Sequence, residues 1–235
     1  SAYLRRRRGV PGSEIQPGGL HLIQVQLGSS KALARGFGRG ALGPMVLLLA
    51  TLAGPVRAEG EQGRIAGEVT APSPKLRAGV VVYLEKVAGP FRPPAEPVTV
   101  DQQGMKFVPR VLAVVRGTTV AFRNSDPVRH NVFTPDGDKY NLGTWPAGES
   151  RSHTFSKSGL YRQLCNVHPE MEAFVLVLDN PFFAVTDDQG RVRLENVPVG
   201  SYTLKTWGEK LAPGSAPVAV AVGQVAAARI ALVRP

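Results

Sequence analysis

Short apolar runs, separated by glycine, proline, asparagine and aspartate, fill the chain from residue 64 onward. The runs recur about every 8–12 residues, as the strands of β-sandwiches do, and none continues with a helical period. Polar and apolar residues alternate from Tyr202 to Thr206, as in a strand with one buried face. The pattern predicts an all-β fold. The predicted strands are Arg64–Thr70, Val80–Glu85, Val98–Asp101, Val111–Val115, Thr118–Arg123, Asn131–Thr134, Ser150–Phe155, Gly159–Cys165, Ala173–Leu178, Arg191–Leu194, Tyr202–Thr206, Val218–Val222 and Ala227–Val233.

Two segments depart from this alternation. Phe174–Leu178 is apolar at every position, which predicts a central strand that is covered on both faces. Gly89–Pro97 is rich in proline, which cannot donate to a strand ladder, so we expect a connector there.

One loop holds the residues with the most distinctive chemistry. Cys165 ends a predicted strand and Ala173 begins the next, so Cys165, His168 and Met171 share one tight connection. His130 lies upstream, on a separate predicted loop of the same end. One thiolate, two imidazoles and one thioether match the ligands of a mononuclear type 1 copper site, in which a weak axial methionine completes a trigonal His2Cys set.

These motifs carry a family resemblance. The segment FVPRVLAVVRGTTVAFRNSDPVRHNV and the Cys-x2-His-x2-Met loop resemble a cupredoxin, with the short ligand loop of the amicyanin-like blue copper proteins. The resemblance implies an eight-stranded Greek-key sandwich, one copper and one-electron transfer. It makes His130, Cys165, His168 and Met171 the ligands. It also implies that Asn131 ties the two ligand loops together beside the sulfur, and that Pro169 belongs to a docking patch around His168, the electron port.

The segments on either side of the cupredoxin-like part resemble two halves of another sandwich. Residues 63–87 and 184–211 resemble a transthyretin-like or carboxypeptidase-regulatory-like domain, and neither half has enough strands to close a core alone. We therefore expect a cupredoxin domain at 98–180, nested within a second, smaller Ig/transthyretin-like β-sandwich that is built from 59–97 and 181–235. One continuous larger sandwich is the alternative.

The N-terminal part of the chain has the pattern of a targeting segment. Residues 31–58 contain a basic stretch, an apolar stretch of about 16 residues and small residues around a Val56-Arg57-Ala58 cleavage pattern, which predicts a secretory signal peptide and export to the periplasm. The apolar stretch is shorter than the roughly 20 residues of a membrane span, so we expect no stable span in the mature chain. Residues 1–30 remain an unassigned extension.

Charge and cysteine content narrow the functional classes. The formal net charge is +10, but eight of the 28 basic residues and one of the 18 acidic residues lie in residues 1–58, so the basic balance does not indicate a nucleic-acid partner. The single cysteine excludes a disulfide framework, a four-cysteine zinc site and a binuclear copper centre. His153 is the spare histidine of the body; we expect it at the surface, and an oxidase or nitrite reductase needs more histidines than that.

The function expected is therefore that of a non-enzymatic, periplasmic electron carrier with one copper. By analogy with amicyanin, its partner would be a redox protein, either a cytochrome or an amine-oxidising dehydrogenase of the methylamine-utilisation type. The alternative is a non-redox role on the same scaffold, as a copper store, a copper donor or a structural interaction module. A His2Cys site can also hold zinc.

Overall fold

The computed structural model describes residues 61–235. The predicted signal peptide at 31–58 and the extension at 1–30 lie outside the described residues, so both stay predictions. No helix among the residues described is long and apolar enough to cross a membrane.

The regular secondary structure of the described residues consists of strands and one short 3-10 helix, η1 (Pro74–Leu76). The strands form four sheets, which pack in pairs as two sandwiches. The predicted all-β class is confirmed. Across residues 61–235 no sheet combines strands β3–β11 (residues 98–178) with strands from the two flanking segments.

The first sandwich holds the middle of the chain. Its sheets have the strand orders β5-β11-β10-β7-β8 and β4-β3-β6-β9. Its core gathers the inward residues of both sheets, among them Phe122, Trp145, Phe155 and Tyr161. The strands are β3 (Val98–Gln102), β4 (Phe107–Val108), β5 (Val111–Val115), β6 (Thr119–Asn124), β7 (His130–Thr134), β8 (Tyr140–Trp145), β9 (Ser150–Thr154), β10 (Gly159–Leu164) and β11 (Glu172–Leu178).

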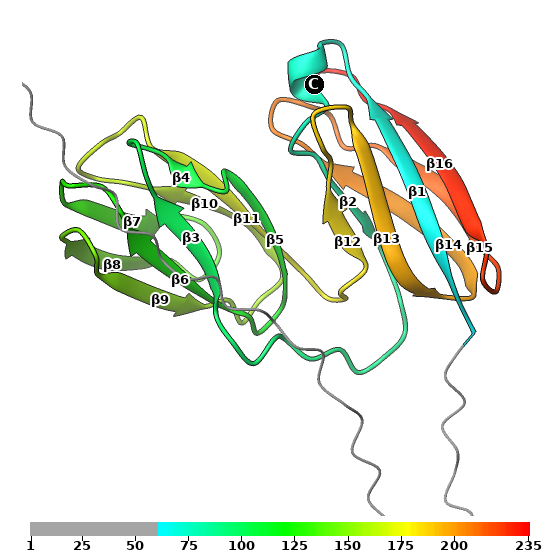
Figure 1. The fold of residues 1–235 in the computed structure, drawn as a ribbon, viewed down its shortest axis with the longest axis horizontal. Coiled ribbons are helices and arrows are strands. Elements are labelled where there is room, and N and C mark those ends of the chain that lie inside the picture. Colours follow the sequence, from blue (N-terminus) through cyan, green and yellow to red (C-terminus); the bar gives the residue numbers. More distant parts are fainter. Residues whose placement is uncertain (1–60) are drawn as a thin grey trace, which may run out of the picture. The chain divides into compact units, whose positions relative to one another are not determined.

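The second sandwich combines residues from both sides of the first. In one sheet β1 runs between β13, to which it is antiparallel, and β16, to which it is parallel (Figure 1). The other sheet has the order β12-β2-β14-β15, and one core joins residues such as Ile65 and Leu84 to Leu204 and Ile230. The strands are β1 (Gln62–Thr70), β2 (Val81–Leu84), β12 (Phe183–Val185), β13 (Arg191–Pro198), β14 (Gly200–Trp207), β15 (Ser215–Val220) and β16 (Val225–Ala231).

Strand β11 is buried on both faces, as its apolar sequence predicted. Ala173, Val175 and Val177 belong to the core of the first sandwich. Leu176 and Leu178 belong instead to a smaller apolar cluster that includes residues of the second sandwich. The two faces of one strand therefore contribute to two different apolar clusters.

Three short or polar strands were missing from the sequence prediction. Strand β4 has two residues and β12 has three, too few to show a period. Strand β8, YNLGTW, contains a glycine, and half of its residues are exposed to solvent. The first sandwich consequently has nine strands among the described residues, where the family resemblance implied eight.

Candidate metal centre

The predicted ligands come from neighbouring strands at one end of the first sandwich. His130 is the first residue of β7, and Cys165 directly follows β10. The two strands are antiparallel neighbours, paired at Leu164 and Phe133, so the beginning of one lies beside the end of the other. The loop from Cys165 to β11 then carries His168 back over this end.

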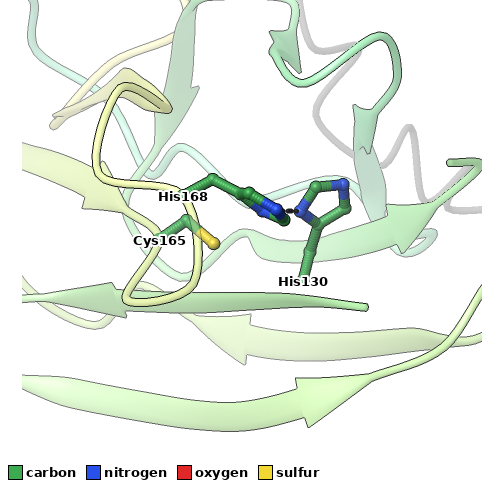
Figure 2. A group of neighbouring side chains, drawn as sticks. All are labelled: His130, Cys165 and His168. Atoms are coloured by element: carbon green, nitrogen blue, oxygen red, sulfur yellow. Dashed lines mark hydrogen bonds between the residues drawn. The ribbon is translucent and has the colours of Figure 1, made fainter. Parts of the chain in front are cut away.

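Three of the predicted ligands converge. One donor atom each from His130, Cys165 and His168 lies within 4.8 Å of the other two. The two histidine Nδ1 atoms are 3.0 Å apart, and Figure 2 shows both rings turned toward each other, with the Cys165 sulfur on the same side. Imidazole nitrogens that share a metal at about 2.0–2.1 Å stand roughly 3.4 Å apart, so the two rings fit a common metal ion.

The site lies just below the surface. His130 is fully buried and Cys165 is 3% exposed, whereas the His168 ring is half-buried. The site therefore excludes water from two of its donors, and His168 connects it to the solvent.

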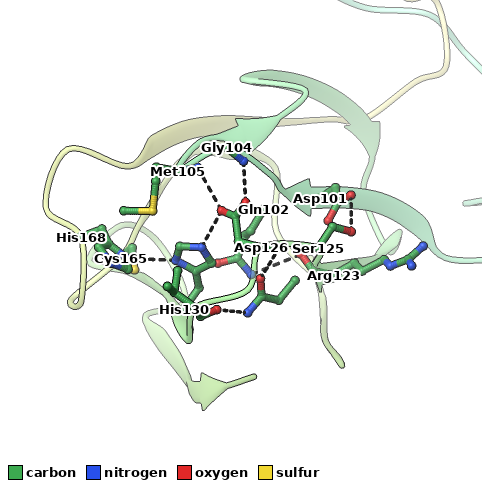
Figure 3. A network of polar contacts seen from close by, with 12 residues as sticks. Asp101, Gln102, Gly104, Met105, Arg123, Ser125, Asp126, His130, Cys165 and His168 are labelled. Atoms are coloured by element: carbon green, nitrogen blue, oxygen red, sulfur yellow. Dashed lines mark hydrogen bonds and ion pairs between the residues drawn. The ribbon is translucent and has the colours of Figure 1, made fainter. Parts of the chain in front are cut away.

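A buried carboxylate fixes the orientation of His130. Oδ2 of Asp126 lies 2.8 Å from Nε2 of His130, and the carboxylate also accepts the N–H groups of Gly104 and Met105 (Figure 3). Because Nε2 donates its proton to Asp126, a neutral His130 presents the lone pair of Nδ1 to the site. Burial alone would raise the pKa of Asp126, but the hydrogen bonds from Met105, His130 and Gly104 together hold the pKa below its usual value.

Asn131 links the two loops that carry the donors. Its backbone N–H points at Sγ of Cys165 over 3.4 Å, and its side-chain oxygen accepts the N–H of Asn166 at 3.2 Å. Its side-chain nitrogen donates to the other strand of the hairpin, at Asn141 and at the Gly143 carbonyl. Asn131 therefore joins the loop that begins at Cys165 to the β7–β8 hairpin.

Met171 and Pro169 complete the same loop. Met171 is 1% exposed and belongs to the same core cluster as Cys165. Its N–H donates to the His168 carbonyl at 3.0 Å, which closes the loop into a tight turn. Pro169 is exposed beside His168.

The donor chemistry favours copper over hard cations. A thiolate and two imidazoles suit copper or zinc, and a thioether such as that of Met171 on the same loop would suit copper better still, whereas magnesium and calcium prefer oxygen ligands. The residues present therefore fit a copper ion.

His153 takes no part in this group. It lies on β9, half-buried, with its ring stacked on Tyr140 at a centroid distance of 3.9 Å. Burial lowers the pKa of His153, and Asp138 opposes this change.

Sequence reasoning missed Asp126 and the turn at Gly104 and Met105. Asp126 lies four residues before His130, and this spacing is the one signal that could have indicated their contact. The turn lies more than twenty positions away, and its contact with Asp126 depends on the pairing of β3 with β6.

Known proteins match the part of the chain that holds this site. Residues 95–178 match the family model of copper binding proteins, plastocyanin/azurin family. Amicyanin from Paracoccus versutus is 28% identical over 102 residues, which are 42% of this chain and 77% of that protein.

Solved structures give the same kind of match. A reduced tryptophan-to-tyrosine mutant of amicyanin is 28% identical and covers 36% of this chain and 84% of its own, with a TM-score of 0.34. A copper-containing nitrite reductase from Thermus scotoductus SA-01 is 30% identical and covers 41% of this chain and 25% of the reductase, with a TM-score of 0.35.

The family match and the convergence of His130, Cys165 and His168 agree with each other. Residues 95–178 of this chain therefore form a cupredoxin domain, a copper-binding domain of the electron-transfer type with one copper as its cofactor.

Proposed function

We propose that this protein is an exported electron carrier with a type 1 copper site, whose ligands are His130, Cys165, His168 and Met171. The observation that carries the proposal is the convergence of two imidazole nitrogens and one thiol sulfur within 4.8 Å. The buried Met171 of the same loop is the axial ligand in this proposal. Copper supplies reversible one-electron chemistry at such a site.

The residues of the chain keep the donors in place before and after each electron. Asp126 holds His130, and Asn131 holds the loop of Cys165. The donors are thus fixed by hydrogen bonds and by the core, so little rearrangement accompanies a change of charge. A site that moves little exchanges electrons quickly.

The His168 ring is the proposed path for the electron. It is the half-buried member of a group whose other two members are buried. Val128 and Val167 are 42% and 46% exposed and lie on the two ligand loops, and Pro169 is exposed next to His168. These apolar side chains form the proposed docking patch, which a redox protein such as a dehydrogenase or a cytochrome would cover.

The proposal also states where the protein works and whether it catalyses a reaction. The signal-like segment at residues 31–58 supports export to the periplasm, where the carrier would work. We propose no reaction on a substrate, because the three donor groups and Asp126 all serve to hold the metal and its ligands.

Addition of Cu(II) to the purified protein tests the site. We expect an intense blue absorption that disappears in Cys165→Ala and persists in His153→Gln, which removes a histidine outside the group. A colourless protein, or equal colour in Cys165→Ala, would contradict the type 1 site. Reversible voltammetry of the blue protein is expected for a carrier, whereas copper release without a reversible couple would favour storage or delivery. Preferential loading with zinc would contradict both copper roles.

A further inference from the structure

We propose that Arg110 is a positioning residue, through which the second sandwich holds the closing end of the copper ligand loop. The inference rests on the proposed function for its significance at copper, since that proposal makes Met171 a ligand. Arg110 directly precedes β5, and it touches none of the donor groups itself.

The guanidinium of Arg110 joins two glutamates from distant parts of the chain. Nη1 donates to the backbone carbonyl of Glu172 at 2.9 Å, and Nη2 donates to the Glu172 carboxylate at 3.0 Å. Nε donates to the carboxylate of Glu209 at 3.0 Å. The planar guanidinium can make these contacts together, because its N–H groups point in fixed and different directions.

Glu172 is the residue that follows Met171. The contact with the Glu172 carbonyl therefore restrains the backbone directly beside the proposed axial ligand. The backbone of Arg110 adds a second restraint, because its carbonyl accepts the Phe174 N–H at 2.8 Å. The guanidinium carbon also lies 5.6 Å from the centroid of the Phe174 ring. Arg110 thus holds the first residues of β11 at several points.

Glu209 belongs to the second sandwich, in the turn after β14. The same turn follows Trp207, whose ring lies 5.1 Å from the Phe174 ring. Val81 of β2 is fully buried in one cluster with Leu176 and Leu178, further along β11. The second sandwich therefore contacts β11 along its length, and Glu209 extends this contact to the end where the ligand loop closes.

This arrangement gives the ligand loop two anchors. The end at Cys165 is held within the first sandwich by Asn131, and the end at Met171 is held through Arg110 by Glu209. The side chains of Arg110 and Glu209 are 48% and 28% exposed, so their ion pair adds at most about 1 kcal/mol to folding. Its larger effect is to limit the movement of Met171 relative to Cys165.

The test compares two glutamate variants of the full chain. Glu209→Gln weakens the link to Arg110. Glu68→Gln is the matched control, because Glu68 pairs with Arg229 at 3.1 Å within one sheet of the second sandwich. Arg110→Lys keeps the charge but loses the fork that reaches both glutamates, so it should reproduce the Glu209→Gln effect in larger measure.

Two readouts apply. In the metal-free protein, we expect faster hydrogen exchange at the Met171 amide in Glu209→Gln and Arg110→Lys, and wild-type exchange in Glu68→Gln. In the copper-loaded protein, we expect Glu209→Gln and Arg110→Lys to release copper to a chelator about threefold faster than the wild type does. This is the effect of losing one exposed ion pair. The ratio of the sulfur-to-copper absorption bands should shift as well, because it reports the axial ligand.

The outcomes separate this inference from the copper proposal. Wild-type exchange at Met171 in Glu209→Gln and Arg110→Lys would overturn the inference, whatever the protein binds. A wild-type chain that never turns blue would overturn the proposed function, and the exchange measurement would still decide whether Arg110 holds the loop. Equal changes in Glu68→Gln would also overturn the inference, because the effect would then come from the second sandwich in general.

Discussion

Asp126 and His130 share one short hydrogen bond, with Oδ2 and Nε2 2.8 Å apart, and both residues are buried. The carboxylate also accepts two backbone N–H groups from the turn at Gly104 and Met105. One side chain thus connects a donor group of the proposed copper site to a turn of the opposite sheet.

Replacement of Asp126 by Asn should weaken both folding and copper binding. The carboxylate accepts on both oxygens, whereas an amide would turn an NH2 group toward an N–H donor of Gly104, Met105 or His130. We expect the loss of about 2 kcal/mol of unfolding free energy in urea and of roughly tenfold in copper affinity.

Asp187→Asn is the matched control for this prediction. Asp187 also accepts backbone N–H groups, from Gln189 and Arg191, but it lies in a turn of the second sandwich. It should lose stability without a change in copper affinity. A similar loss of affinity in both variants would show that Asp126 has no special effect on the site.

Removal of copper should lower stability by an amount set by its affinity. A ligand that binds only the folded state at a concentration of 100 times its dissociation constant adds about 2.7 kcal/mol. We expect the melting temperature to rise with copper concentration in the wild-type protein and to stay constant in Cys165→Ser. An equal rise in Cys165→Ser would mean that copper stabilises the protein elsewhere.

Gly190→Ala should be among the most damaging alanine substitutions in the second sandwich. Gly190 has a φ of +78°, and a Cβ there would clash with the Val69 carbonyl oxygen of β1. Left-handed backbone conformation and overpacking together predict a loss of about 3 kcal/mol. Gly223→Ala is the control, because its φ is +65° and no atom lies within 4 Å of its Cβ position. It should lose only about 1 kcal/mol in the same unfolding experiment.

The stability contributed by Asp136 should depend on pH. Asp136 accepts the backbone N–H and the guanidinium of Arg162, on β10. Burial acts to raise the pKa of Asp136, but the hydrogen bonds from Arg162 outweigh it and the pKa is lowered. A carboxyl with a lowered pKa stabilises the fold fully above its unfolded pKa of about 3.9, and the contribution is lost as pH falls through the lower folded value.

Asp136→Asn should therefore be less stable than the wild type at pH 7, by about 0.5–1 kcal/mol because the pair is partly exposed. The difference should shrink below about pH 4. Parallel urea unfolding curves between pH 7 and pH 3 measure it. If the difference in unfolding free energy stayed constant from pH 7 to pH 3, the prediction would be wrong. The effect would then come from the shape of the side chain and not from its charge.

The donor group could be predicted because its residue types are rare in this chain and two of its members lie close together in the sequence. Cys165 is the single cysteine, and His168 follows it on the same loop. The contact of Arg110 with Glu209 joins residues 99 positions apart, on two different sandwiches, and no local pattern pairs them. The all-β class followed from alternation in the longer strands, whereas β4 and β12 are too short to alternate. The resemblance of the second sandwich to transthyretin-like domains stays a prediction.

The double burial of β11 limits how this protein can be divided. A fragment cut at residues 97 and 180 would keep the proposed copper ligands but would expose Leu176, Leu178 and the Phe174 ring to water. Exposed apolar side chains on a sheet face promote aggregation. We therefore expect a fragment of residues 98–180 to be less soluble than the full chain, because the second sandwich covers one face of β11.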